Sequence, residues 1–519
     1  MEQVQTRWNG WGLPGHSDPL AVNEPAWRWL AQSFAMPALL ATPPRDLTGI
    51  ALPPSRLSEQ ARHKLTNLLG EVEQGKFERA RHAAGRSLTD LLRLRAGDLS
   101  AAPDAILYPR RESDVAAALK LCAELDIAVV PWGGGTGDMT LARRHHTAVA
   151  VLNMSDVNRF KSLDRMSALA EVEAGITGPD LERQLKAHGM MLDHRPDGFE
   201  FSTLGGWIAQ PGVSHAVPRW LQSLRVATPQ GSITTDDTLN SLMMGSQGAF
   251  GVVTAATLRV RALPAREEHR AYLFPDFASG LAAMHQARRL GLPNIFLRLS
   301  DDGETRFSQA IAKEGQEWNL VDHLFSVYLS VRRFDGRAAR LIAGFAGDAD
   351  EVRAQRRYFD SLAQKLGALA LGPDARWAEQ RSLSGYRRDT LLDRGVSMDS
   401  VDVSCSWTKL PGLYVAVRAA LKQAMRNHAP RSGAHGLVLC HAGAARTDGA
   451  VLTFTWLFPR ILDDAIAQAD NIRRTALAAI PDGGNRELER GILRGIKRVL
   501  DPDAVLNPGL AIPRSISEW

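Results

Sequence analysis

The chain has little cysteine and no long hydrophobic run. Its cysteines lie far apart and form no Cys-x-x-Cys pair, which predicts neither a disulfide framework nor a zinc cluster and favours a reducing compartment; they are Cys122, Cys405 and Cys440. No apolar stretch approaches the ~20 residues that a membrane-spanning helix needs. The first residues also lack the basic and apolar regions of a signal peptide. We therefore expect a cytoplasmic protein with at most peripheral membrane contact.

Charge of one sign is also scarce. The formal net charge is +5 over 519 residues, and the basic residues are dispersed. No zinc-finger spacing, basic helix or interleaving of basic and aromatic residues is present, so nucleic-acid binding is not expected. A small anionic substrate would account for the slight positive excess. The content of 45% hydrophobic and 23% charged residues is typical of a globular protein, and the length predicts several structural units.

Glycine, by contrast, is concentrated in three loops. Residues Pro131–Gly137 read Pro-Trp-Gly-Gly-Gly-Thr-Gly, directly after the apolar run Ile127–Val130. Without Cβ atoms, the N–H groups of such a loop can converge on one anion, although a run of this kind alone is as typical of a tight turn. The spacing matches neither G-x-G-x-x-G nor a P-loop. Because His194–Ile208 and Gly245–Thr254 again combine glycines with hydroxyl side chains, we expect an extended ligand with a central pyrophosphate.

Apolar periodicity predicts an α+β protein of several units. Ser58 and Ser87 are expected to cap the first two predicted helices. Helices are predicted over Leu57–Leu69, Leu88–Leu94, Glu112–Glu124, Gly178–His188, Phe277–Leu290, Gly336–Gly347, Asp350–Lys365 and Leu488–Leu500. Strands are predicted over Ile106–Tyr108, Ile127–Val130, Ala148–Leu152, Phe325–Arg332, Gly412–Val417, Gly436–His441 and Val451–Phe458.

The order of the glycine loops resembles the FAD domain of the vanillyl-alcohol oxidase and p-cresol methylhydroxylase (PCMH/VAO) superfamily. Within it, two runs resemble the alkylglycerone-phosphate synthases: Trp8-Asn9-Gly10-Trp11-Gly12 and Glu200-Phe201-Ser202-Thr203-Leu204-Gly205-Gly206-Trp207. The resemblance continues to Leu506-Asn507-Pro508-Gly509. It implies a two-subdomain FAD-binding domain over 101–264 and an α/β cap domain over 265–480 with a sheet over the flavin. An N-terminal helical extension over 1–100 and a C-terminal segment over 481–519 that returns to the FAD domain complete the expected fold.

The resemblance also implies which residues bind the cofactor FAD. They are Pro131, Gly133, Gly134, Gly135, Thr136, Gly137, Pro196, Asp197, Ser202, Thr203, Gly205, Gly206, Ile208, Gly248, Gly251, Val252 and Val253. An alternative for Ser202 and Thr203 is a structural turn in which they cap backbone groups. Gln247 stands where the family usually has glutamate. Many relatives attach FAD through a histidine in the first glycine loop, and none lies between Pro131 and Thr140, which predicts non-covalent FAD.

Two arginines match positions at which the synthases hold a phosphorylated substrate, Arg298 and Arg388, with Arg387 as an ambiguity. The proton-transferring groups of that family do not match. Its histidine cluster corresponds to Asp482–Glu487, and threonine replaces its cap-strand tyrosine within Val451–Trp456. The first segment has no histidine, and threonine cannot replace a phenol or imidazole as general base near neutral pH without an activating partner. The remaining histidines form no metal-ligand pair, so no metal site is expected, and His441 is favoured over the others as the proton carrier; those are His194, His215 and His435.

These departures favour an FAD-dependent oxidoreductase that acts on a small substrate bearing a carboxylate or phosphate, by flavin redox or N5-adduct chemistry. In this hypothesis Arg298, Arg388 and His441 are the catalytic residues. One alternative is a true alkylglycerone-phosphate synthase, which forms the ether bond of ether lipids. Another is a catalytically inactive flavin-binding subunit. The resemblance further implies a homodimer.

Overall fold

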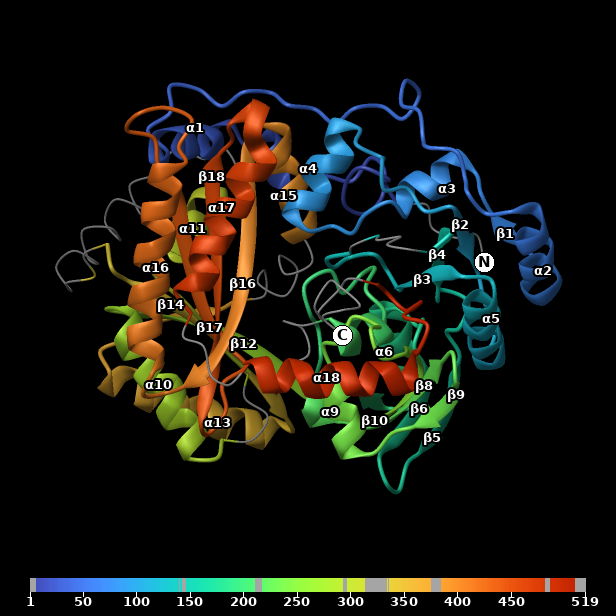
Figure 1. Cartoon of the computed structure of the whole chain (residues 1–519). Helices are drawn as coiled ribbons and strands as arrows, with labels where there is room; N and C mark the ends of the chain where they lie inside the picture. The colour runs from blue at the N-terminus through green and yellow to red at the C-terminus, as the bar shows by residue number, and fades with distance from the viewer. Residues whose placement is uncertain are drawn as a thin grey trace. The chain divides into compact units, whose positions relative to one another are not determined.

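The computed structural model describes residues 6–139, 141, 146–210, 217–292, 296–312, 334, 336–374, 384–480 and 486–508. The chain divides into two units (Figure 1). The first unit contains Met1–His16, Pro44–Leu263 and Gly483–Trp519, and the second contains Ser17–Pro43 and Pro264–Asp482. The N-terminal hundred residues, expected as one extension, are thus shared between both units. Among the described residues, no helix is long and apolar enough to cross a membrane.

A four-stranded sheet carries the first glycine loop. Its strands follow the order β1 (Val72–Glu73), β2 (Ala105–Leu107), β4 (Ala148–Asn153) and β3 (Ile127–Trp132). Strands β2 and β3 both pair with β4 in parallel. Helix α5 (Glu112–Glu124) connects β2 to β3 and buries an apolar face with α2 (Glu59–Leu69). This arrangement confirms the predicted α/β alternation, and β4 reads as a continuous apolar run because it is buried throughout.

A five-stranded antiparallel sheet forms the other half of the first unit. Its order is β5 (Phe160–Asp164), β6 (Leu169–Glu173), β10 (Val252–Arg259), β8 (Leu221–Thr228) and β9 (Gly231–Thr234). Its core includes side chains from α18 (Arg486–Leu500), so the C-terminal helix packs here. The smaller elements of the unit are α3 (Lys76–Arg81), α4 (Leu88–Ala96), α6 (Gly178–Ala187), β7 (Met190–Met191), α7 (Leu204–Ala209), α8 (Val217–Trp220), α9 (Asp237–Met243) and β11 (Arg261–Ala262).

The second unit is built on a seven-stranded antiparallel sheet (Figure 1). Its order is β15 (Leu369–Pro373), β12 (Arg266–Phe274), β14 (Ala339–Gly347), β13 (Phe296–Ser300), β17 (Leu437–Gly443), β18 (Gly449–Pro459) and β16 (Val396–Ser406). The helical elements are η1 (Pro19–Val22), α1 (Glu24–Ser33), α10 (Phe277–Arg289), α11 (Asp302–Ala312), α13 (Ala349–Lys365), α15 (Ser384–Asp393), α16 (Leu410–Asn427), η4 (Leu462–Asp464) and α17 (Ala465–Ala478).

The two faces of this sheet have different neighbours. On one face Leu299 packs at Gly280 of α10, and Phe454 stacks on Tyr414 of α16. On the other face Leu439 belongs to a cluster with residues of α1 and α11. Because successive side chains of a strand alternate between faces, Arg298 lies on the face opposite to Leu299, and His441 lies on the same face as Leu439. We call this second face the α11 face.

Most predicted elements are confirmed. The side chain of Ser58 caps α2 by accepting from the Ala61 N–H over 3.2 Å, and Ser87 caps α4 by accepting from the Asp90 N–H over 3.2 Å. The predicted helix over Gly336–Gly347 is wrong, because Ala339–Gly347 is the central strand β14. That strand is buried on both faces, so its sequence shows none of the alternation that identifies an edge strand.

A second error concerns a short apolar run. The predicted strand Gly412–Val417 lies inside the 18-residue helix α16, which buries Leu410, Leu413, Val417 and Leu421 along one stripe. A run of six residues fits either element, and only the longer window shows the helical spacing. The predicted strand Phe325–Arg332 lies outside the described residues. Strands β12 and β16, together with helices α11, α15 and α17, were not predicted individually.

Candidate functional site

The first glycine loop begins where β3 ends, at Trp132. A Cβ on Gly134 would overlap the carbonyl oxygen of Phe201, and a Cβ on Gly135, which has a φ of +65°, would overlap the Trp132 ring. These two positions therefore require glycine. Within the described part of the chain, the backbone N–H groups of residues 133–137 donate to no other protein group. These five N–H groups are therefore candidate donors for an external anion, and we call them the cradle.

The structure brings the three predicted loops together in the first unit. The Thr203 side chain occupies the space where Gly133 would carry a Cβ. A Cβ on Gly248 would lie 2.7 Å from Cγ of Pro131. The loops that contain residues 131–137, 198–206 and 245–251 therefore surround one region, which we call the glycine-loop region. Helix spacing or composition alone could not establish this proximity.

The C-terminal segment also reaches the glycine-loop region. Asn507 donates from its backbone to Val129 over 2.8 Å and from Nδ2 to the carbonyl of Gln247 over 2.7 Å. Lys497, only 2% exposed, donates to the carbonyls of Ala249 over 2.5 Å and Leu506 over 2.8 Å. Burial lowers the pKa of Lys497 despite its ion pair with a nearby aspartate. Sequence reasoning missed this buried lysine, because a lysine on an amphipathic helix ordinarily faces solvent.

The two side-chain hydroxyls of the second loop accept hydrogen bonds from the protein itself. Ser202 Oγ accepts from the Trp207 indole over 2.7 Å, and Thr203 Oγ1 accepts from the Gly206 N–H over 3.2 Å. As acceptors, both hydroxyl oxygens stabilise a structural turn, which was the alternative considered for these two residues. Each hydroxyl also has a proton that it can donate to a ligand. Ile208 and Val252 belong to the buried core, so they can meet a ligand only through their backbone. The predicted cofactor residues Pro196 and Asp197 precede Gly198 in the second loop, and Asp197 is exposed.

A second cluster lies on the α11 face of the seven-stranded sheet. Arg298 donates from Nη2 to Glu304 over 2.7 Å and to Nδ1 of His441 over 3.1 Å. Its Nη1 donates to Ser300 over 3.1 Å. Nδ1 of His441 lies 3.5 Å from the second carboxylate oxygen of Glu304. We call Arg298, Glu304 and His441 the Arg298 cluster. It joins two of the three predicted catalytic residues, from strands β13 and β17.

Charge governs the ionisation of Glu304. Burial by itself raises the pKa of this carboxyl group, but Arg298 and His441 outweigh that effect and hold the pKa well below its ordinary value. Glu304 is therefore an anion at neutral pH and exposes 14% of its side chain. It neutralises much of the charge of Arg298. From the sequence alone, that charge was expected to bind a substrate anion.

Asp301 fixes the position of Glu304. It is fully buried, and Oδ1 accepts from the backbone N–H of Glu304 over 2.8 Å at the start of α11. The same atom accepts from the N–H of Cys440 over 3.1 Å, and Oδ2 accepts from the Tyr414 hydroxyl over 3.0 Å. Burial raises the pKa of Asp301 to about 6, although Arg418 opposes this shift. The signal in the sequence was Asp301 three residues before Glu304, the spacing of a helix cap.

Polar side chains cross the sheet in line with His441. Antiparallel register places residues of β14, β13, β17, β18 and β16 directly opposite one another in one row, and paired residues share a face. The row consists of Arg340, Ser300, His441, Thr453 and Asp402. Thr453, one of two threonines on the strand where the synthase family has a tyrosine, donates its hydroxyl to Asp402 over 2.6 Å. The threonine is thus beside the histidine but hydrogen-bonded away from it.

The third predicted catalytic residue does not join the Arg298 cluster. Arg388 lies on α15, which packs on β16 and η1, and β16 is separated from β13 by two strands. Its neighbour Arg387 donates to Asp18 over 3.1 Å, and the Asp18 side chain is fully buried. Arg387 is therefore engaged in an ion pair, and the anion-binding role of Arg388 stays a prediction.

The other histidine candidates lie elsewhere. His194 packs between Trp207 and Trp220, with ring centroids 5.0 Å and 5.2 Å away. His435 makes backbone contacts beside Gly433, whereas His215 lies outside the described residues. The segment that corresponds to the synthase histidine cluster, 482–487, lies outside them for residues 482–485. Among the residues that the structure describes, no group of three or more His, Cys, Asp or Glu side chains could hold a metal ion.

Two family models match the chain, one in each unit. The model described as FAD binding domain matches residues 103–237, and the model described as FAD linked oxidases, C-terminal domain, matches residues 263–480. A solved structure of alkyldihydroxyacetonephosphate synthase, also called alkylglycerone-phosphate synthase, superposes with a TM-score of 0.83 at 26% identity. The superposition covers 98% of this chain and 98% of that one. The chain belongs to the PCMH/VAO-type family of FAD-binding enzymes.

Both synthases and dehydrogenases are among the relatives of this chain. Alkyldihydroxyacetonephosphate synthase of Dictyostelium discoideum is 28% identical over 98% of this chain and 94% of the relative. D-lactate dehydrogenase of Anaerostipes hadrus is 23% identical over 79% of this chain and 89% of the relative. The structure of p-cresol methylhydroxylase, at 14% identity and a TM-score of 0.63, shares the fold. As a family member, the protein is an FAD-dependent enzyme, which confirms the predicted cofactor and fold.

Proposed function

We propose that the protein is an alkyldihydroxyacetonephosphate synthase, which exchanges the acyl chain of acyl dihydroxyacetone phosphate for a long-chain alcohol. The observation that carries this proposal is the likeness to synthases through both units, over 98% of the chain, against 79% for the D-lactate dehydrogenase. This evidence favours the first alternative of the sequence analysis over the oxidoreductase that the missing histidines and tyrosine had favoured. The released products are the alkyl ketone phosphate and a fatty acid.

In this proposal the glycine-loop region holds FAD without a covalent bond. The five unpaired N–H groups of residues 133–137, with the Thr136 hydroxyl, receive the diphosphate. Gly205 and Gly206, with Gly248 and Gly251, allow the other two loops to approach the same ligand closely. Bound FAD supplies an electron-accepting ring, which no amino-acid side chain provides. The chain's own contribution is to position this ring and the substrate.

The Arg298 cluster is proposed to bind the substrate anion and to move its proton. Glu304 and His441 share Nη2 of Arg298, and Ser300 takes one proton of Nη1. The second Nη1 proton and the Nε proton are the donors that an incoming phosphate can take. Arg388 is proposed as a second anion-binding residue.

His441 is the proposed base for the proton beside the substrate ketone. If its Nδ1 carries the proton toward Glu304, 3.5 Å away, Nε2 is a free acceptor. If Nδ1 instead accepts from Arg298, Nε2 carries the proton and acts as a donor. The same ring can therefore take up and return one proton, with Arg298 and Glu304 as the alternative partners of Nδ1. A positioned acid or base of this kind typically contributes ~10²- to 10⁴-fold to a rate.

The test is direct. Purified holoenzyme is incubated with acyl dihydroxyacetone phosphate and a long-chain alcohol, and the expected result is an alkyl product together with free fatty acid. His441→Gln serves as the comparison variant. Absence of alkyl product from wild-type enzyme that retains FAD would overturn the synthase proposal.

A 2-hydroxy-acid oxidase or dehydrogenase is the second candidate. The pairing of Arg298 with His441 favours it, because oxidation of such an acid needs a cation for the carboxylate and a base for the hydroxyl. Anaerobic addition of D-lactate and related acids distinguishes the two: bleaching of the flavin supports this candidate. Flavin that no donor bleaches, without alkyl product, supports an inactive flavin-binding subunit instead. A homodimer and a cytoplasmic location stay predictions.

A further inference from the structure

Arg86 is a buried arginine whose guanidinium group donates to four backbone carbonyls. It is 5% exposed. Nε donates to Gly10 over 2.8 Å and Nη2 donates to Arg7 over 2.8 Å, while Nη1 donates to Ala84 over 3.0 Å and Gly85 over 2.9 Å. A planar fork with five N–H groups suits four carbonyls in this arrangement, whereas an ammonium group does not.

One of these carbonyls, that of Gly10, belongs to the Trp-Asn-Gly-Trp-Gly motif near the start of the chain, and Arg7 directly precedes that motif. The motif forms a closed loop, in which the Arg7 N–H donates to the Gly12 carbonyl over 2.8 Å. Trp8 and Trp11 are buried, at 7% and 6% exposed. This motif is one of the two runs that resemble the alkylglycerone-phosphate synthases.

The segment that contains Arg86 also contacts the first glycine loop. The backbone N–H of Arg86 donates to the Gly137 carbonyl over 2.9 Å. A Cβ on Gly85 would overlap that carbonyl oxygen and lie 2.8 Å from the Met139 nitrogen. The Met139 N–H in turn donates to Asp90 over 3.4 Å. Residues 85–90 therefore contact the loop at Gly137 and Met139, just past the five unpaired N–H groups.

The motif also reaches the second glycine loop. A Cβ on Gly198 would lie 2.7 Å from the Trp11 ring, and Trp11 packs edge-on against Phe201 at 6.2 Å between centroids. The Phe201 carbonyl is the group that requires glycine at position 134. Trp11 therefore connects the N-terminal motif to the second glycine loop, and Arg86 connects it to the first.

We infer that Arg86 is a positioning residue that, through the Trp-Asn-Gly-Trp-Gly motif, holds the first two glycine loops in the conformation that binds FAD. The inference rests on the proposed assignment of the Gly133–Gly137 cradle to FAD. Its physical basis is preorganisation. When a loop occupies the binding conformation only part of the time, the apparent Kd of the ligand equals the intrinsic Kd divided by that fraction.

The experiment uses the full chain as apoprotein and measures the dissociation constant of FAD by flavin fluorescence, together with the apoprotein Tm. The test variants are Arg86→Ala and Gly85→Ala. Arg79→Ala is the matched control, because Arg79 is equally buried at 7% and also donates to carbonyls, those of Pro103 over 2.6 Å and Pro53 over 2.8 Å. Gly134→Ala tests the cradle itself.

We expect Arg86→Ala and Gly85→Ala each to raise the Kd of FAD about tenfold, as when the competent loop falls to about a tenth of the population. Arg79→Ala should lower the apoprotein Tm without moving the Kd by more than about twofold. Arg86→Lys should not restore binding, because lysine lacks the fork.

Two results overturn the inference while leaving the cradle assignment intact: a wild-type Kd in Arg86→Ala when Gly134→Ala has lost binding, or full recovery by Arg86→Lys. If Arg86→Ala does not fold, Arg86→Lys decides the matter, because it keeps a long cationic side chain and removes only the fork: a wild-type Kd in this variant overturns the inference. Wild-type affinity in Gly134→Ala would instead contradict the proposed cradle itself.

Discussion

Nη2 of Arg298 lies 3.1 Å from Nδ1 of His441, although the two residues are 143 positions apart in the chain. Adjacent strands β13 and β17 create this pair, and Glu304 on α11 contacts both members. In the proposed function Arg298 binds the substrate anion and His441 moves the proton. Substitution of the arginine should therefore change mainly KM, and substitution of the histidine mainly kcat.

We expect His441→Gln to lower kcat by ~10²- to 10⁴-fold with a small change in KM, because glutamine keeps the polarity of the site but moves no proton. Arg298→Lys should mainly raise KM for the anionic substrate, by roughly tenfold or more, because lysine cannot present two parallel donors. Steady-state kinetics with the substrate established for the enzyme provide the measurement. Equal losses in kcat for both variants would contradict this division of roles.

The neighbouring arginines 387 and 388 should separate in the same way. Arg387→Ala leaves the fully buried carboxylate of Asp18 without this ion pair, so we expect a loss of about 3 kcal/mol in the free energy of unfolding. Arg388→Ala should raise KM with little loss of stability. Chemical denaturation of both variants, beside kinetics, checks the assignment; a large KM effect in Arg387→Ala alone would reverse it.

FAD should leave the protein when it unfolds. No histidine occurs in residues 131–140, so acid precipitation is expected to release all the yellow colour into the supernatant. Absorbance of the supernatant and of the washed pellet measures this. Colour that stays with the polypeptide would show a covalent bond at some other residue.

Asp301 should make stability depend on pH between 5 and 7. Its folded pKa, about 6, is above the ordinary value of 3.8, because burial disfavours the charged form. The folded state therefore binds the extra proton, and this contribution is present at low pH and lost as the pH rises through 6. Relative to Asp301→Asn, wild-type protein should lose about 1 kcal/mol of unfolding free energy from pH 5 to pH 7. Denaturation curves at both pH values test this, and a constant difference would contradict it.

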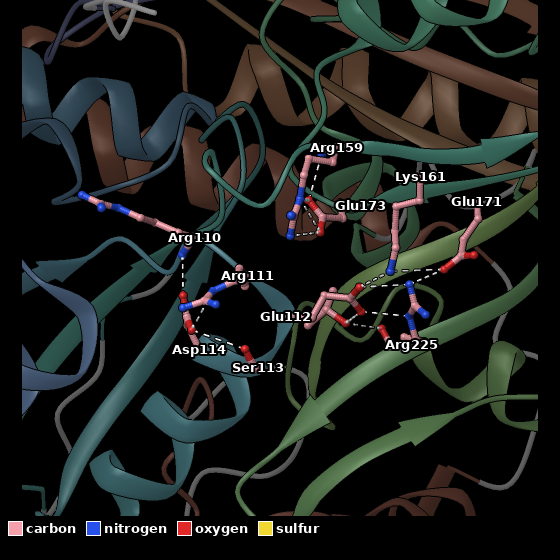
Figure 2. Close-up of polar contacts among 11 residues, drawn as sticks. Arg110, Arg111, Glu112, Ser113, Asp114, Arg159, Lys161, Glu171, Glu173 and Arg225 are labelled. Carbon is pink, nitrogen blue, oxygen red and sulfur yellow. Dashed lines mark hydrogen bonds and ion pairs between the residues drawn. The ribbon is translucent and has the colours of Figure 1, made fainter.

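Glu112 links α5 to the five-stranded sheet (Figure 2). Its carboxylate accepts from Lys161 over 2.7 Å, Arg225 over 2.9 Å and Thr254 over 3.1 Å. Burial alone raises its pKa, but Lys161 and Arg225 bring it below the ordinary value, so the ionised form is the stabilising one. We expect Glu112→Gln to cost about 1 to 2 kcal/mol at pH 7.

The matched control for Glu112 is Glu59→Gln, since Glu59 pairs with Arg62 on an exposed helix face. Its expected cost is much smaller than that of Glu112→Gln, because solvent screens an exposed ion pair. The difference between the variants should also shrink as the pH falls below the ordinary carboxyl pKa, where the Glu112 contribution is lost. Urea denaturation at pH 7 and at about pH 3 provides both comparisons. Equal losses in the two variants would show that the link between α5 and the sheet adds nothing.

Local signals in the sequence were sufficient where the structure depends on local backbone conformation. The glycine at 135, the caps Ser58 and Ser87, and helices such as α5 each follow from residues within one or two turns of chain, whereas glycine at 134 is required by the distant carbonyl of Phe201. The same reasoning failed for β14 and for residues 412–417, because a buried central strand and a short apolar run carry no distinctive period.

The sequence by itself located the three glycine-rich loops, because a loop without Cβ atoms is a property of consecutive residues, and its resemblance to a known family predicted the cofactor FAD. Only the tertiary structure decided that Glu304 shares Arg298 with His441, that Arg387 is engaged by Asp18, and that Arg86 reaches back to Gly10. Those pairs come from separate strands, helices and loops, and their distances depend on strand register and packing. Register and packing are set by the whole buried core rather than by any short segment.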